Sequence, residues 1–124
     1  MIAGCALIGL RASVLGVSAD DPAASLALTI RGLLSAMASQ IGAKPETIGL
    51  DRAIDVDDSQ VGDGYGIPTP ASTEARELLA RTEGIVLDQT YTAKAMAGLI
   101  TRARSGHFTK DQTILFWHTG GLGL

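Results

Sequence analysis

Short apolar runs that are typical of β-strands alternate along the chain with longer segments whose apolar positions follow a helical period. The predicted strands are residues 12–18, 53–56, 85–87 and 113–117. The last of them, TILFW, shows no polar alternation, as expected for a strand covered on both faces. Alternation of strands and helices predicts an α/β fold with a mainly parallel sheet.

Three helices are predicted between these runs, and residues 2–10 look like the end of a further helix. Residues 22–41 begin with a proline after two aspartates and stop before Gly42, which are typical start and stop signals. Their apolar positions recur at steps of four, three, four and four and predict one buried face, made of Leu26, Ile30, Leu33, Met37 and Ile41. The other two helices are predicted from residue 69 to about residue 81 and from about residue 91 to residue 104.

Composition narrows the class of protein. The 124 residues are 46% hydrophobic and 19% charged, a globular profile with room for one small domain. The net charge of −3 contains no block of like charges, so we expect no nucleic-acid partner and no polybasic membrane patch. A single cysteine, Cys5, excludes an intrachain disulfide and fits a reducing cytoplasm.

Neither membrane nor metal signals are expected from the sequence. The apolar opening lacks a basic segment before it and a cleavage site after it, so we expect no export signal. We also expect no apolar run long enough to span a bilayer. Asp57, Asp58 and Asp63 lack the spaced ligands of a calcium loop, and a solvated loop is predicted instead of a metal site.

Residues 62–68, GDGYGIP, place three glycines around Tyr65. Glycines permit unusual backbone angles and the close approach of a ligand. The alternative is a surface turn whose tyrosine packs on a neighbouring helix, since glycine-rich loops are common.

Residues 87–96, LDQTYTAKAM, carry Tyr91 from a predicted strand end into a helix start. Residues beyond the carboxyl ends of strands line ligand crevices in α/β sheets, and helix starts favour nearby anions. The alternative is that Thr90 caps the helix while Tyr91 packs locally.

Residues 116–121, FWHTGG, form a third predicted strand end. Two glycines after a buried strand would let a flat ligand lie against the backbone, with the Thr119 hydroxyl at its edge. The alternative is a tight turn. His118 by itself is interpreted as structural, and the three lysines, Lys44, Lys94 and Lys110, as solvated surface cations.

The order and spacing of these motifs resemble the last part of the D-cysteine desulfhydrase and ACC (1-aminocyclopropane-1-carboxylate) deaminase family. That family belongs to fold type II of the pyridoxal-phosphate enzymes, which is similar to tryptophan synthase β. The resemblance implies a partial three-layer fold, a mainly parallel sheet flanked by helices. It implies that residues 1–124 are the C-terminal part of the catalytic fold, with pyridoxal 5'-phosphate as cofactor and a homodimeric parent enzyme.

The resemblance also implies roles for individual residues. Tyr65 and Tyr91 match two active-site tyrosines that face the substrate. Thr92 stands where the deaminases carry a glutamate that meets the pyridine nitrogen. Thr119 matches a neutral partner near that nitrogen, and the residues implied to border the ring are Gly120 and Gly121. Ala93 departs from the glycine that is usual there, and its methyl group would narrow the site.

Thr92 favours one reaction within the family. A hydroxyl leaves the ring nitrogen largely neutral, which gives a weaker electron sink than a glutamate would. Elimination of sulfide needs less carbanion stabilisation than ring opening does, so we expect D-cysteine to give pyruvate, ammonia and sulfide. The alternatives are ACC deaminase or another type II lyase and, in a different class, a non-catalytic remnant or complementing fragment.

The family's Schiff-base lysine and glycine-rich phosphate loop lie upstream of the matched region. None of the three lysines of this chain occupies that place. We therefore predict that this polypeptide alone forms no covalent link with pyridoxal phosphate and eliminates no sulfide. The measurement is borohydride reduction after cofactor addition, followed by mass spectrometry, and a stoichiometric adduct on one lysine would contradict the prediction.

Overall fold

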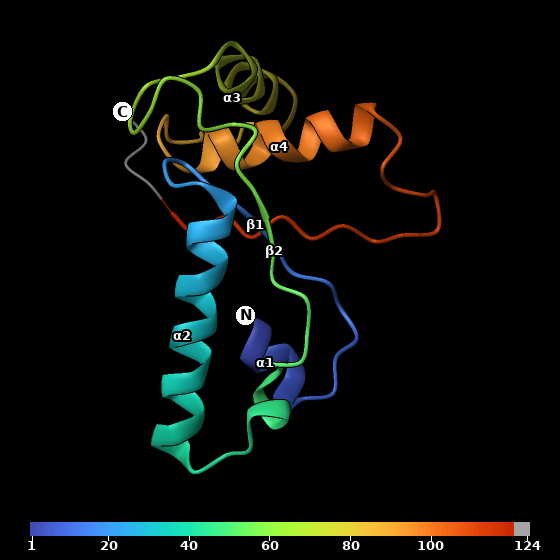
Figure 1. The fold of residues 1–124 in the computed structure, drawn as a ribbon. Coiled ribbons are helices and arrows are strands. Elements are labelled where there is room, and N and C mark those ends of the chain that lie inside the picture. The colour runs from blue at the N-terminus through green and yellow to red at the C-terminus, as the bar shows by residue number, and fades with distance from the viewer. Residues whose placement is uncertain (121–124) are drawn as a thin grey trace. The chain divides into compact units, whose positions relative to one another are not determined.

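The computed structural model describes residues 1–120, and the chain divides into two compact units (Figure 1). The first unit contains Met1–Gly16 and Pro22–Val56. The second joins Val17–Asp21 to the chain that begins at Asp57. Each unit has its own cluster of buried apolar side chains, so each is described separately.

The first unit is built from α1 (Ile2–Leu7), α2 (Ala23–Ile41) and the 3-10 helix η1 (Pro45–Ile48). The long helix ends where the sequence predicts, because Gly42 adopts the left-handed conformation that stops a helix (φ 64°). The buried cluster of this unit consists of Ala3, Leu34, Ala38 and Ile48.

The buried face of α2 agrees with the predicted one only in part, since Ile30 packs against the buried cluster as predicted. Leu34 and Ala38 are buried, whereas Leu33 is 65% exposed and Ile41 is 56% exposed. The predicted stripe assumed that every apolar position faces one core. In this unit α2 contributes one narrow side to the buried cluster, and the apolar residues on its other sides face outward.

By length and composition alone, α2 could cross a membrane. Its 19 residues include a window of mean hydropathy 1.2, so the prediction that no apolar run reaches this length is wrong. One such helix among the described residues is weak evidence, because core helices of soluble proteins and signal sequences meet the same criteria. The absence of a membrane partner stays a prediction.

The strands β1 (Leu15–Val17) and β2 (Asp55–Asp57) form a two-stranded sheet. Gly16 lies against the Asp55 carbonyl, and the Ser18 N–H donates to the Asp57 carbonyl at 2.8 Å. Residue numbers therefore increase in the same direction along both strands, so the strands are parallel. In the chain, α2 lies between the two strands and forms the crossover connection. Helices and a parallel sheet agree with the predicted α/β class.

Two predicted strands, residues 85–87 and 113–117, are wrong. Among residues 1–120, neither segment pairs with a neighbouring strand, and a strand exists only through its ladder of hydrogen bonds. Of the TILFW run, only Phe116 packs against a buried cluster, while Leu115 is 78% exposed and Trp117 is 60% exposed. The apolar pattern indicates β-propensity, but the pairing is a tertiary property that the pattern does not supply.

The second unit is organised around the packing of α3 (Pro70–Glu83) against α4 (Thr92–Arg104). A reciprocal capping box between Thr69 and Ser72 starts α3, as the Thr-Pro signal predicts. An exposed ion pair links Arg104 of α4 to Glu74 of α3 at 2.7 Å. The buried cluster between the helices consists of Ala75, Leu87, Ala93, Met96 and Ala97.

Close packing also fixes α4 against the end of β1. A Cβ atom added at Gly98 would lie 3.3 Å from both methyl groups of Val17. Arg102, one turn further along, donates to the Asp57 carboxylate at 2.9 Å. Hence α4 is anchored within the second unit at several points along its length.

Replacement of Ile48 tests the core of the first unit. Ile48 is fully buried, so we expect Ile48→Ala to lower the free energy of unfolding by about 2–5 kcal/mol through lost burial and a residual cavity. Urea denaturation followed by circular dichroism measures the change. Leu28→Ala is the matched control, because Leu28 is 72% exposed and its loss should cost less than about 0.5 kcal/mol. Equal losses in both variants would contradict the described core.

Candidate functional site

Tyr65 and Tyr91, which the sequence singles out, lie together in the second unit. Their hydroxyl oxygens are 2.5 Å apart although the residues are 26 positions apart in the chain. The rings meet edge to face, with centroids 5.9 Å apart and an angle of 68° between the planes. The side chains are 57% and 51% exposed, so a small molecule can reach both phenols. Their role in catalysis stays a prediction.

A tight turn presents Tyr65. The Ile67 N–H donates to the Gly64 carbonyl at 3.3 Å, which closes a four-residue turn with Tyr65 as its second residue. Gly64 and Gly66 have φ values of 135° and 72°, a region that glycine enters without steric cost. The side-chain amide of Gln89 donates to the Gly66 carbonyl at 3.3 Å and ties the turn to the segment before Tyr91.

Asp88 positions Tyr91 at the start of α4. Its carboxylate accepts hydrogen bonds from the backbone N–H groups of Thr90, Tyr91 and Thr92 at 3.0, 2.7 and 2.9 Å. Burial alone would raise the pKa of Asp88, but these bonds and one from the Thr92 hydroxyl outweigh burial and lower the pKa. The carboxylate is therefore charged at neutral pH and occupies the N–H groups of Tyr91 and Thr92 at the helix start.

This arrangement corrects the alternative in which Thr90 caps the helix, because Asp88 covers the helix start instead. It also means that the N–H groups of Tyr91 and Thr92, which could attract an outside anion, already bind a carboxylate from the same chain. The sequence patterns did not predict this role of Asp88. An aspartate directly after an apolar run and four residues before the first residue of a helix is the signal that would have found it.

The hydrogen bond between the phenols sets the acid–base character of Tyr91. That bond to Tyr65 is the main reason why the pKa of Tyr91 is raised above its ordinary value, with smaller contributions from burial and the negative charges of Asp88 and Asp20. Tyr91 is thus protonated at neutral pH. It can donate a hydrogen bond or a proton, but it is not poised to act as a base.

Thr92 already has a structural role. Thr92 is 2% exposed, and its hydroxyl donates to the Asp88 carboxylate. The same Thr92 hydroxyl oxygen accepts a hydrogen bond from the Asp88 backbone N–H at 2.9 Å. These bonds account for the threonine without any cofactor, and its contact with a pyridine ring stays a prediction.

The remaining predicted site residues lie near the end of the chain. Thr119 and Gly120 are exposed, and within the described chain no hydrogen bond joins Thr119 to either tyrosine. His118 accepts from the Gly120 N–H at 3.2 Å, which fits the structural interpretation of this histidine. Gly121 lies outside the described residues.

Lys94 is not the solvated cation that the sequence predicts. The side chain is fully buried, and its amine donates to the carbonyl oxygens of Ala19, Val61 and Gly64. The sequence analysis missed this role because helical spacing does not distinguish a buried lysine at the border of an apolar face from an exposed one. Lys44 and Lys110 are exposed, as predicted.

Three positions of the second unit that could hold pyridoxal phosphate, the cofactor that the resemblance implies, already bind groups of this chain. An aldehyde needs a free lysine amine, and the Lys94 amine has used all three of its donors inside the protein. A phosphate needs free N–H groups at a loop or helix start, and Asp88 and the Thr69–Ser72 pair occupy the starts of α4 and α3. The exposed phenols are the part of the site that remains open.

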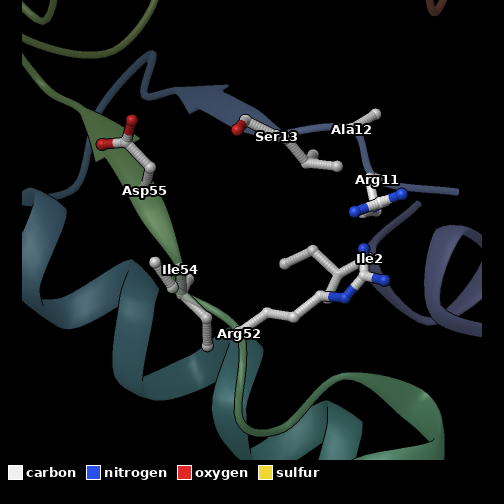
Figure 2. A pocket seen from close by; sticks show the side chains of 9 residues that line it. Ile2, Arg11, Ala12, Ser13, Arg52, Ile54 and Asp55 are labelled. Atoms are coloured by element: carbon white, nitrogen blue, oxygen red, sulfur yellow. The ribbon is translucent and has the colours of Figure 1, made fainter.

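A separate cavity of about 600 Å³ lies in the first unit, and the sequence analysis did not predict it. Figure 2 shows Arg11 and Arg52 on one side of it and Asp55 on the other. One Arg52 nitrogen donates to the Leu10 carbonyl at 3.0 Å. Charges of both signs line the cavity, so it shows no preference for one class of ion. Among the described residues, no group of three potential ligands could hold a metal.

The phenol pair can be tested by titration, because the chain contains only two tyrosines. We expect Tyr65→Phe to lower the pKa of Tyr91 toward about 10, since the variant removes the hydroxyl that holds its proton. The near-ultraviolet absorbance of tyrosinate measures the change. Trp117→Phe is the control, because Trp117 is an exposed aromatic with no described contact to the pair, and it should leave the titration unchanged. An unchanged Tyr91 in Tyr65→Phe would contradict the described hydrogen bond.

Comparison with known proteins identifies what this arrangement is similar to. The D-cysteine desulfhydrases of Salmonella typhi and Salmonella newport (strain SL254) are each 44% identical over 90 residues, which is 63% of this chain and 27% of theirs. A crystal structure described as an ACC deaminase homologue matches 98% of this chain and 35% of its own, with a TM-score of 0.83 and 25% identity. The chain thus spans about a quarter to a third of these relatives. The family model described as pyridoxal-phosphate dependent enzyme matches residues 2–120, and the chain belongs to that family.

Proposed function

We propose that this chain supplies the substrate-facing tyrosines of a pyridoxal-phosphate-dependent lyase that eliminates sulfide from D-cysteine. The observation that carries the proposal is the exposed pair of phenols, whose hydroxyls share one hydrogen bond. The desulfhydrases that are 44% identical to the chain support the choice of substrate class. In such an enzyme the cofactor supplies the electron sink for the elimination.

The phenol pair can donate to a bound amino acid. Two phenols carry two protons, and the hydrogen bond between the oxygens uses one of them. The other proton is free to point toward a substrate carboxylate or a leaving sulfur atom. The raised pKa of Tyr91, caused mainly by its hydrogen bond with Tyr65, keeps the Tyr91 proton in place at neutral pH. The phenols therefore act as donors that orient the substrate or protonate the departing sulfide.

The proposal requires residues that this chain does not contribute. A lysine amine and a phosphate cradle must come from another segment, as expected for a chain that spans 27% of the desulfhydrases. We infer that the tyrosine site becomes active when such a segment is joined to it. The homodimeric parent enzyme and the cytoplasmic location remain part of this proposal, and the single cysteine, Cys5, supports the location.

A second candidate, ACC deamination, is favoured by the match to the ACC deaminase homologue at a TM-score of 0.83. The uncharged Thr92, in place of the glutamate that the resemblance associates with deaminases, favours sulfide elimination over it. Both reactions need donors facing a small amino acid, so the phenol pair alone does not decide between them.

A chimera provides the test. The matched segment of the Salmonella typhi enzyme would be replaced by the corresponding segment of this chain, and pyruvate and sulfide release from D-cysteine would be measured beside ACC turnover. We expect D-cysteine to be the better substrate. Tyr65→Phe and Tyr91→Phe should each lower kcat by about 100- to 10,000-fold, the usual contribution of a positioned proton donor.

The matched control in this chimera is Lys110→Ala, an exposed residue outside the site, which should retain full activity. A folded chimera whose activity survives both tyrosine substitutions would overturn the proposed role of the pair. A chimera that turns over ACC in preference to D-cysteine would replace the first function by the second.

A further inference from the structure

Lys94 makes an unusual set of contacts for a buried charge. Its side chain is fully buried, and its nitrogen lies 3.1, 2.7 and 2.9 Å from the carbonyl oxygens of Ala19, Val61 and Gly64. An ammonium group has three N–H donors and no acceptor, so three carbonyls match it fully. A neutral amine would leave one of these carbonyls without its donor.

Two of the three carbonyls belong to the loop that carries Tyr65. The Gly64 carbonyl is part of the peptide group that joins Gly64 to Tyr65, and a peptide group is planar. A fixed position of that oxygen therefore also fixes the peptide plane that contains the Tyr65 Cα atom, to which the side chain is attached. The Val61 carbonyl lies three residues earlier in the same loop, so Lys94 holds the loop at two points.

Lys94 itself lies in the first turn of α4, three residues after Tyr91. The ammonium thus connects the Tyr65 loop to the helix whose start places Tyr91. Between residues 61–66 and residues 88–94, the other described hydrogen bonds are the one between the phenols and the one from Gln89 to the Gly66 carbonyl, and both are exposed. A buried charge-assisted bond is stronger than an exposed neutral one, because water does not compete for it.

We propose that Lys94 is a positioning residue whose buried ammonium fixes the Tyr65 loop on α4 and so holds the two phenols in contact. The catalytic value of this contact rests on the proposed function, whereas the contact itself is a structural property that can be measured without any activity. Lys94 touches no substrate in this assignment and acts through the loop alone.

The direct measurement is NMR of the chain labelled with 13C at Cζ of tyrosine, which gives two signals at neutral pH because there are two tyrosines. Tyr65→Phe and Tyr91→Phe assign the signals and show the position of a phenol without its partner. We expect Lys94→Met, an uncharged unbranched side chain that is one atom shorter than lysine, to move both signals to the positions found in those single variants. Lys110→Met is the matched control and should leave both signals in place, because Lys110 is exposed.

Chemical rescue separates positioning from a general loss of folding. Lys94→Ala removes three carbons and the nitrogen, which n-propylammonium replaces. We expect added propylammonium to return both signals to their wild-type positions in a saturable manner. Tetramethylammonium, a cation without N–H donors, should have no such effect at the same concentration.

Each outcome decides the inference. Unchanged tyrosine signals in a folded Lys94→Met chain would overturn it. If Lys94→Met fails to fold, saturable recovery of Lys94→Ala with propylammonium supports the inference, and the absence of recovery overturns it. Failure here would leave the proposed function standing, since that function is tested separately by the activity of Tyr65→Phe and Tyr91→Phe in the chimera.

Discussion

The ammonium group of Lys94 holds the described tyrosine site together. It binds the carbonyl oxygens of Ala19 and of two residues in the Tyr65 loop, and one of these two belongs to the peptide group next to Tyr65. Because a buried ammonium is costly unless every donor is satisfied, the loop and the helix are constrained to one arrangement. The phenol pair lies at the exposed end of that arrangement.

A second buried charge acts on the other tyrosine. The Asp88 carboxylate collects three backbone N–H groups and the Thr92 hydroxyl at the start of α4. The site thus has an exposed pair of hydroxyls supported by one buried cation and one buried anion. A pair held in this way is suited to hydrogen-bond donation, since the raised pKa of Tyr91, due first to Tyr65, disfavours loss of its proton.

Local signals predicted much of the helical structure. The predicted ends of α2 and the predicted start of α3 agree closely with the structure. They were predicted from a proline and a glycine at the ends of α2 and from the Thr-Pro pair at the start of α3, and such caps depend on neighbouring residues only. The buried side of α2 was predicted less well, with Leu33 exposed and Leu34 buried. The TILFW run shows the same limit, since its apolar pattern does not specify a partner strand.

The sequence by itself determined the family resemblance, the helix ends and the two tyrosines as candidate site residues, since these follow from residue types and short spacings. Only the tertiary structure decided that Lys94 is buried, that Asp88 covers the start of α4 and that the phenols touch. Each of these contacts joins a side chain to groups whose position depends on how distant segments pack. A buried charge and a solvated one can have the same sequence neighbours, and only the surrounding carbonyls and N–H groups distinguish them.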